Sequence, residues 1–492
     1  MKPIKQLISF IFLTLFVATH LQAQETNKVP KNNFLANSPW PTYHGDNYRQ
    51  SSTYIKGPTK GDKIELKILK KIKGGTSPWT YLSDKYPNGK RVLLQSNATH
   101  FYKIIDDNNG LRIIAKQKID GDWLKSFGWN MLQTKGNVWY TYDPKYNPKR
   151  NQYTRLFKIT DVNPKNPYSR IQVVDTFSFK NTKIGKVQHY GINYNGQIVF
   201  ASDNDKGKTN CTVGIISPDF KLLKTLKLKS LPNEIFGHNA FPIDENNSFY
   251  IVTTKRLIRV DWKNNQLSIG FEAYYDFVAD GPTGKFAEGS GTTPTLMGTQ
   301  KGKDRLIVMA DGHQKNNLVA FWREIPKDWK GIKGQDIRLA GKIQLPAAQK
   351  FSNLFQSIEN SPTVFGYDVA IAQFNGFLGQ RKKTYKGVQK IRWNTTLNKF
   401  EVSWVNKQIN MNGVLTYSKG ANLVYGSGKE GCSFYYYGLN WDTGAVEFKY
   451  KLGSNCRKMF NPFDDGGNNN IIDEQGNIYF SGGGSLLKLE KQ

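Results

Sequence analysis

The stretch GHNAFPIDENNSFYIVTTKRLIRVDWKNNQLSIGFEAYY (residues 237–275) decides the fold class. It begins with a short polar segment, continues through an apolar strand, a turn, a second strand and a third, and reaches a fourth strand after the Asn264-Asn265 turn. Apolar runs joined by Asn and Gly turns, without helical periodicity, predict a four-stranded antiparallel sheet.

The same layout recurs along the chain. Seven further units begin at Thr76, Phe127, Gln188, Ser290, Glu359, Met411 and Gly466, with spacings of roughly 45 to 70 residues. Two more segments pair a third strand with a fourth across a polar turn, KIRWNTTLNKFEVSWVNK (390–407) and GLNWDTGAVEFKYKLG (438–453). The repeat therefore extends over nearly the whole chain.

Repeated four-stranded sheets predict a β-propeller, because each sheet can bury its faces only by stacking radially on its neighbours. We expect an all-β chain with a single propeller of eight blades, or seven if the unit at Phe127 is a loop excursion. The last unit has three strands, and residues 64–73 form an isolated strand that can supply its outer edge. This N-terminal strand would close the ring and remove its open edge.

The first 24 residues have the features of a signal peptide: Lys2 and Lys5, an apolar run from about Leu7 to Ala18, and Ala23 near the cleavage point. We expect residues 25–39 to be a linker and residues 40–492 to be the propeller. No later segment is long and apolar enough for a membrane span. The expected protein is exported, to the periplasm or the medium, and monomeric.

The charge balance favours an anionic partner. The full chain carries a formal net charge of +30, and removal of the two leader lysines leaves about +28. For an exported protein this excess points to a sulfated or uronic acid polysaccharide first and an anionic envelope surface second, with no nucleic acid expected. The simpler alternative is that abundant lysine keeps the protein soluble.

Three cysteines remain in the predicted mature chain. In an oxidising compartment Cys432 and Cys456 can form a disulfide, which leaves Cys211 single and buried. No pattern of metal-binding or haem-binding cysteines occurs. The cysteines are therefore expected to be structural.

In a propeller, the start of each first strand and the loop after each second strand converge on one face. Four of the five histidines beyond the leader are at such positions, and His44 is the exception. The catalytic candidates are His238, His189, Tyr190, Lys255 and His313. The substrate-binding candidates are Trp79, Trp129, Asn130, Asn239, Arg256, Lys315 and Asn360. Polar residues at these positions can instead hydrogen-bond the neighbouring blade, which would make them structural.

These residue types suit β-elimination on a uronic acid. A base removes the proton at C5, an acid assists departure at C4, and cations must neutralise the carboxylate. We assign His238 or His189 as base or acid with Tyr190 as partner, and Lys255 and His313 to the carboxylate. Trp79 and Trp129 would stack on sugar rings. No cofactor is certain. His189, His238 and His313 could hold zinc or another divalent ion, and a calcium site is what a quinone cofactor would need.

Two family resemblances add to this interpretation. WPTYHGDNYRQSS (40–52) and NWDTGAVEFKYKL (440–452) resemble the entry strand and the repeat of quinoprotein-like propellers, which implies the fold rather than a reaction. In overall plan, the basic exported propeller also resembles the ulvan-degrading propeller enzymes of marine bacteria, which act as lyases or dehydratases on a sulfated uronate polysaccharide.

The resemblances and the candidate residues together imply a carbon–oxygen lyase acting on acidic glycans, with the choice between lyase and dehydratase left open. One alternative is a non-catalytic propeller that binds acidic polysaccharide or scaffolds an envelope complex. A quinone-dependent or metal-dependent oxidoreductase is the third.

Overall fold

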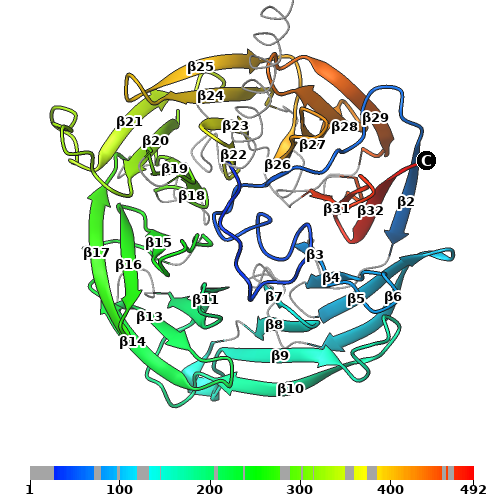
Figure 1. Ribbon diagram of the computed structural model, residues 1–492, viewed down its shortest axis with the longest axis horizontal. Helices are drawn as coiled ribbons and strands as arrows, with labels where there is room; N and C mark the ends of the chain where they lie inside the picture. Colours follow the sequence, from blue (N-terminus) through cyan, green and yellow to red (C-terminus); the bar gives the residue numbers. More distant parts are fainter. Residues whose placement is uncertain are drawn as a thin grey trace, which may run out of the picture.

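The computed structural model describes residues 27–70, 79–96, 100–118, 132–143, 146–203, 209–236, 239–277, 289–300, 303–313, 315–348, 360–373, 385–456, 461–463 and 470–492. Their strands form eight sheets arranged as a ring, one for each predicted unit (Figure 1). The unit at Phe127 is a blade and not a loop excursion. Within the described ranges the only helix is the 3-10 turn η1 (Pro148–Arg150).

The first four blades follow one another along the chain. Blade 1 contains β3 (Thr80–Leu82), β4 (Leu93–Ser96), β5 (His100–Asp107) and β6 (Gly110–Lys118). Blade 2 contains β7 (Leu132–Thr134), β8 (Val138–Asp143), β9 (Arg155–Asp161) and β10 (Ile171–Ser178). Blade 3 contains β11 (Val187–Ile192), β12 (Ile198–Ser202), β13 (Cys211–Ile216) and β14 (Leu222–Leu228). Blade 4 contains β15 (Phe249–Val252), β16 (Arg256–Lys263) and β17 (Gln266–Tyr274).

The remaining four blades complete the ring. Blade 5 contains β18 (Thr295–Met297), β19 (Leu306–Ala310), β20 (Asn317–Trp322) and β21 (Leu339–Gln344). Blade 6 contains β22 (Thr363–Phe365), β23 (Asp368–Ala372), β24 (Val388–Asn394) and β25 (Lys399–Asn406). Blade 7 contains β26 (Asn412–Ser418), β27 (Leu423–Glu430), β28 (Ser433–Asn440) and β29 (Val446–Ser454), with β1 (Ser52–Thr53) parallel to β26. Blade 8 contains β30 (Ile471–Ile472), β31 (Ile478–Gly482), β32 (Ser485–Lys491) and β2 (Ile64–Lys70).

Blade 8 combines the two ends of the described chain. Strand β2 pairs antiparallel with β32 from Ile64↔Lys491 to Lys70↔Ser485, and the two strands lie side by side at the rim (Figure 1). β2 therefore lies at the outer edge of the last blade, where the sequence predicts the strand of residues 64–73. β2 is the outermost strand of this four-stranded sheet, and β32 is the strand with which it pairs.

Apolar side chains fill the space between successive blades. One cluster combines Val199 and Val213 of blade 3 with Ile251 and Ile258 of blade 4, and the other clusters occupy equivalent positions around the ring. Tryptophans near the ends of β16 and β24 tie neighbouring blades together. Trp262 donates its indole hydrogen to Gln197 at 2.7 Å, and Trp393 to Asp304 at 2.7 Å.

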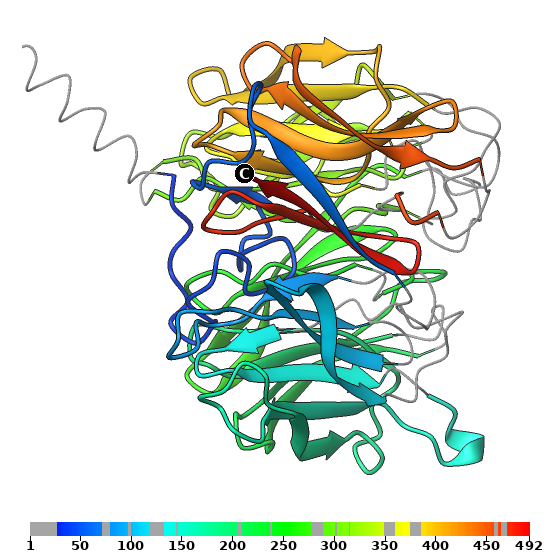
Figure 2. The same ribbon diagram turned by 90° about the vertical axis from the view of Figure 1, so that its right-hand side faces the viewer.

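The middle of the ring is occupied by residues 40–52, which we call the hub (Figure 1). The preceding residues run along one face of the disc, as the edge-on view shows (Figure 2). From the sequence this segment is expected to be an entry strand, but only Ser52–Thr53 is a strand. The hub instead bonds the inner edges of many blades, so no single partner strand imposes an extended conformation on it.

Residues 27–39 pack against the ring before the hub begins. The Asn32 side chain donates to the backbone oxygens of Ile192 and Asn193, both at 3.1 Å. Leu35 forms a bridge with Thr134 of blade 2 and belongs to the apolar cluster between blades 2 and 3. The segment predicted as a linker thus has specific contacts with two blades.

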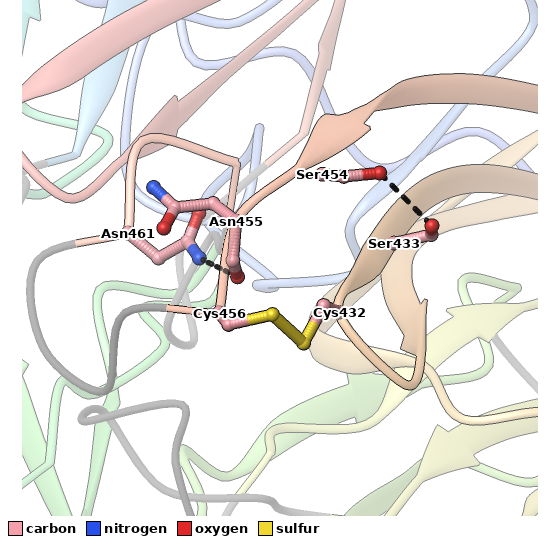
Figure 3. Close-up of a disulfide and its surroundings, with 6 residues drawn as sticks. All are labelled: Cys432, Ser433, Ser454, Asn455, Cys456 and Asn461. Atoms are coloured by element: carbon pink, nitrogen blue, oxygen red, sulfur yellow. Dashed lines mark hydrogen bonds between the residues drawn. A yellow bond between two sulfur atoms is a disulfide. The ribbon is translucent and has the colours of Figure 1, made fainter.

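The predicted disulfide between Cys432 and Cys456 is confirmed (Figure 3). It joins the turn before β28 to the residues after β29, beside a hydrogen bond between Ser433 and Ser454 at 3.0 Å. Cys211 is free and buried, as expected.

Candidate functional site

The hub connects blades that are far apart in the sequence. Backbone N–H groups of five blades donate hydrogen bonds of 2.8 to 3.1 Å to backbone oxygens of the hub. The donor–acceptor pairs are Leu82–Trp40, Ile243–Asn47, Leu296–Tyr48, Val364–Gln50 and Tyr417–Ser51. The Asn47 and Gln50 side chains donate to Ile192 and Leu296, both at 2.9 Å. The inner face of the propeller is therefore lined by the N-terminal segment.

Ionisable side chains are buried within this hub. Arg49 donates to the backbone oxygens of Phe241 at 3.1 Å and Tyr43 at 2.8 Å, and to the Thr42 hydroxyl at 3.1 Å. Burial lowers the pKa of Arg49 to about 10, although Asp46 acts in the opposite direction. Burial also raises the pKa of Asp46 to about 6. The positive charge on Arg49 is retained at neutral pH.

His44 is fully buried beside Arg49. Its Nδ1 lies 2.7 Å from Ser51 Oγ, and its Nε2 has no hydrogen-bond partner among the described residues. Burial, together with the charge of Arg49, lowers the pKa of His44 well below its usual value, so the ring is neutral. Three hub residues other than glycine have positive φ, His44 at 57°, Arg49 at 67° and Ser51 at 54°. Such strained backbone persists only where surrounding contacts fix it.

The paired candidates His189 and Tyr190 lie on β11 of blade 3. A register shift between Val187 and His189 marks an irregular strand start, and both side chains are buried. The Tyr190 hydroxyl donates to the Tyr140 backbone oxygen at 3.4 Å, and burial raises the pKa of Tyr190 well above its ordinary value. A phenol buried between two blades is not suited to proton transfer near neutral pH.

Lys255 and Arg256 lie where β15 turns into β16. Lys255 Nζ donates to the Pro232 oxygen at 2.5 Å. Arg256 is 3% exposed, pairs with Glu234 through Nε at 2.8 Å, and also pairs with Glu272 at 2.6 Å. These contacts hold blade 4 together, and the guanidinium group is compensated within its own blade.

His313 and Lys315 belong to the turn between β19 and β20 of blade 5. Lys315 is exposed, and His313 is partly buried. Asp311 accepts hydrogen bonds from the backbone N–H groups of His313 at 3.2 Å and Asn317 at 2.8 Å. Burial raises the pKa of Asp311. A buried carboxyl group and an imidazole therefore share this turn.

The asparagine and tryptophan candidates form hydrogen bonds or ring contacts with neighbouring protein groups. Asn239 donates to the Ser290 oxygen of blade 5 at 3.0 Å, and Asn360 donates to the Gln373 oxygen at 3.2 Å. Trp79 is 5% exposed, with its ring 4.2 Å from that of Tyr43. His238, Trp129 and Asn130 lie outside the described residues. The candidates that the structure describes come from five different blades.

An open groove of about 610 Å³ lies between blades 1 and 2, away from the hub. Its lining consists of His100, Tyr102, Ile113, Ile114, Ala115, Lys116, Arg170 and Ile171. The rings of His100 and Tyr102 stack at 5.6 Å. Lys116 and Arg170 are exposed, and in the described part of the chain neither pairs with a carboxylate. The groove thus combines the partly exposed His100 ring, which stacks on the buried Tyr102, with aliphatic side chains and two cations.

Sequence reasoning did not find the hub residues or most of the groove. His44 was set aside because it heads no repeat unit, although the structure places it in the middle of the ring. The polar content of residues 40–52 was the available signal, since an edge strand needs no buried Arg, Asp and His together. The groove has no local signal, because it is formed by separate segments of two blades.

Two further observations bear on metals and membranes. Across the described ranges, no three His, Cys, Asp or Glu side chains gather in a way that could hold a metal ion. The same residues include no helix with the length and hydropathy of a membrane span.

Comparisons with known proteins support the fold. No family model matches the chain. A curated protein of Archaeoglobus fulgidus, described as an uncharacterized protein, is 27% identical over 443 residues, covering 85% of this chain and 81% of the relative. Its description names no activity.

Solved structures agree on a propeller at low sequence identity. The Dos1 propeller matches with a TM-score of 0.50 and 10% identity, covering 91% of this chain and 96% of that one. A candidate 6-phosphogluconolactonase from Bacteroides fragilis has a TM-score of 0.42 and 11% identity, covering 78% and 97%. The similarity to the Dos1 propeller supports the β-propeller fold and nothing finer.

Proposed function

We propose that this protein is an exported β-propeller that binds an acidic polysaccharide or oligosaccharide in the groove between blades 1 and 2. The observation that carries the proposal is the lining of the groove. Two exposed cations, Lys116 and Arg170, flank a stacked His100–Tyr102 pair and aliphatic side chains. Cations pair with carboxylate or sulfate groups, while aromatic and aliphatic surfaces pack on the C–H faces of pyranose rings.

Charge and covalent structure support the same proposal. The net charge of +30 would attract a polyanion over long range. The Cys432–Cys456 disulfide is of the kind that persists in oxidising compartments, in keeping with export to the periplasm or the medium. The ionic contacts of Arg256 and the burial of Tyr190 speak against a catalytic role for these two candidates.

The test is a comparison of charge reversals. Binding of the protein to ulvan and to uncharged dextran would be measured by affinity electrophoresis and calorimetry. We expect binding to ulvan only, weakened at least tenfold in Lys116→Glu/Arg170→Glu. The matched control, Lys224→Glu/Lys227→Glu on β14, makes the same change in net charge at exposed residues of blade 3. Equal losses in both variants, or no binding to any acidic glycan, would refute the proposal.

A second candidate function is β-elimination on a uronate, as a lyase or a dehydratase. The turn that holds Asp311 and His313 favours it, because a carboxyl group with a raised pKa and an imidazole in one turn can act as acid and base. Incubation with ulvan and its oligosaccharides should then raise the absorbance of unsaturated uronates. An increase in absorbance that His313→Ala or His238→Ala abolishes in a folded protein would support elimination. No increase with any uronate substrate would refute it.

A further inference from the structure

The groove between blades 1 and 2 continues towards an exposed aromatic side chain. Arg170, which lines the groove, follows Tyr168 by two residues in the connection between β9 and β10. The intervening Ser169 is buried, and its backbone oxygen accepts a hydrogen bond from Lys103 of blade 1 at 3.2 Å. The connection is thus fastened to the neighbouring blade, so Tyr168 and Arg170 keep a fixed relation to it.

Tyr168 is held in place by charged groups of blade 1. Its hydroxyl donates to Asp107 at 3.1 Å and accepts a hydrogen bond from Lys90 at 3.0 Å. Arg112 pairs with the same carboxylate at 2.7 Å and lies 5.6 Å from the centre of the Tyr168 ring. Tyr168 nevertheless remains 41% exposed. A large side chain that is already fixed loses little conformational entropy when a ligand packs on it.

The chemistry of this position matches that of the groove. An exposed aromatic ring beside Lys90 offers a surface for the C–H face of a pyranose and a cation for its acidic substituent. Asp107 is compensated by Arg112 and does not leave a free negative charge here. The two positions therefore favour the same class of ligand.

The spacing of the two positions sets the length of ligand. Arg112 contacts Tyr168, and Lys116 lines the groove four residues further along β6. At about 3.3 Å per residue this distance is roughly 13 Å, longer than one sugar ring. A ligand that reaches from Tyr168 to Lys116 must therefore contain more than one linked sugar.

We propose that Tyr168 is a second sugar-binding position of this site, so that the seam between blades 1 and 2 recognises a stretch of acidic glycan rather than a single sugar. One pyranose packs on Tyr168, and the carboxylate or sulfate of a nearby unit pairs with Arg170 and Lys116. This inference rests on the proposed function and extends it from a groove to an oligosaccharide site.

The test compares ligand lengths. Calorimetric titrations would use glucuronate, a uronate-containing ulvan tetrasaccharide and the polymer, with the folding of each variant checked by circular dichroism and thermal unfolding. Tyr168→Ala should lower affinity for the tetrasaccharide and the polymer roughly tenfold and leave that for glucuronate unchanged. Tyr168→Phe should retain most of the affinity because the ring remains. Tyr274→Ala, which removes an exposed tyrosine of blade 4, is the matched control and should bind like the wild type.

The outcomes separate this inference from the proposed function. If Lys116→Glu/Arg170→Glu weakens binding of all lengths and Tyr168→Ala changes none, the groove binds glycan and the extension to Tyr168 is wrong. If neither variant changes binding, both proposals fail. Tighter, Tyr168-dependent binding of a single-stranded oligonucleotide than of the tetrasaccharide would overturn the assignment to a glycan.

Discussion

Burial of the ionisable residues in the hub costs free energy, because it removes them from water. Arg49 is 2% exposed, yet it satisfies its guanidinium with backbone oxygens rather than with a close carboxylate pair. A buried charge is tolerated only when hydrogen bonds replace its hydration. The hub therefore depends on correct placement of several oxygens from the chain around it.

Asp46 should make the stability of the protein depend on pH. Its pKa of about 6 in the folded chain lies above the ordinary 3.8, so the folded state binds this proton more tightly than the unfolded state. The resulting stabilisation is complete below about pH 4 and is lost as the pH rises through 6. The free energy of unfolding should fall across this range by at most about 3 kcal/mol from this group.

Asp46→Asn removes this titration. Urea unfolding at pH 4, 5, 6 and 7 should show the variant gaining stability relative to the wild type as the pH rises. Asp328→Asn, at an exposed position of blade 5, is the control for a change of one charge. A stability difference that stays constant between pH 4 and 7 would contradict the assignment.

At the scale of the element, a turn with the same side-chain hydrogen bonds recurs in three blades. In INYNGQI (192–198), IDENNSF (243–249) and IDEQGNI (472–478), an Asn or Asp side chain accepts backbone hydrogen bonds from the residues two and four positions on. Gly196, Asn247 and Gly476 occupy the same position in these turns with positive φ. Such turns are local, so they form wherever the sequence provides them.

The disulfide is an element-scale constraint on blade 7. It closes a segment of 24 residues that contains the β28–β29 hairpin. Strand pairing already holds most of this segment, so Cys432→Ser/Cys456→Ser should lower the free energy of unfolding by about 1 to 3 kcal/mol. Denaturant unfolding of the variant, and of the wild type with and without reductant, would measure the effect. A loss of the whole fold on reduction would show that the bond does more than restrain one blade.

At the scale of the whole molecule, the N-terminal segment supports the ring in two places. The hub bonds the inner strands of blades 1 and 3 to 7, and β2 completes blade 8 at the rim. Trp40 and Tyr48 of the hub are fully buried. Removal of one such aromatic side chain costs about 3 to 5 kcal/mol, whereas domains are stable by about 5 to 15 kcal/mol in total.

A chain that begins at residue 54 should therefore fail to fold cooperatively, although it retains β2. A chain that begins at residue 27 keeps the hub and should unfold in one transition. Thermal unfolding followed by circular dichroism, with size-exclusion chromatography, would compare the two. A single transition of the shorter chain within a few degrees of the longer one would show that the hub is dispensable.

Fold and site differ in how far the sequence could predict them. The eight blade starts could be predicted because turns and apolar runs are local signals. The roles of individual candidates could not, since Arg256 meets Glu234 22 positions away and Asn239 meets Ser290 51 positions away. Whether a polar side chain faces a ligand or a neighbouring blade depends on such distant partners.

The sequence by itself determined the all-β class and a repeat of eight units, one of which could have been a loop, because strand periodicity and turn residues need little tertiary information. It offered the pairing of Cys432 with Cys456 as one possibility, and the structure confirmed it. Only the tertiary structure decided what occupies the middle of the ring and where two blades form a basic groove. The bond between Gln50 and Val364 and the contact between Arg112 and Tyr168 join segments that no local pattern relates. Their geometry is fixed by ring closure and by the packing of neighbouring blades.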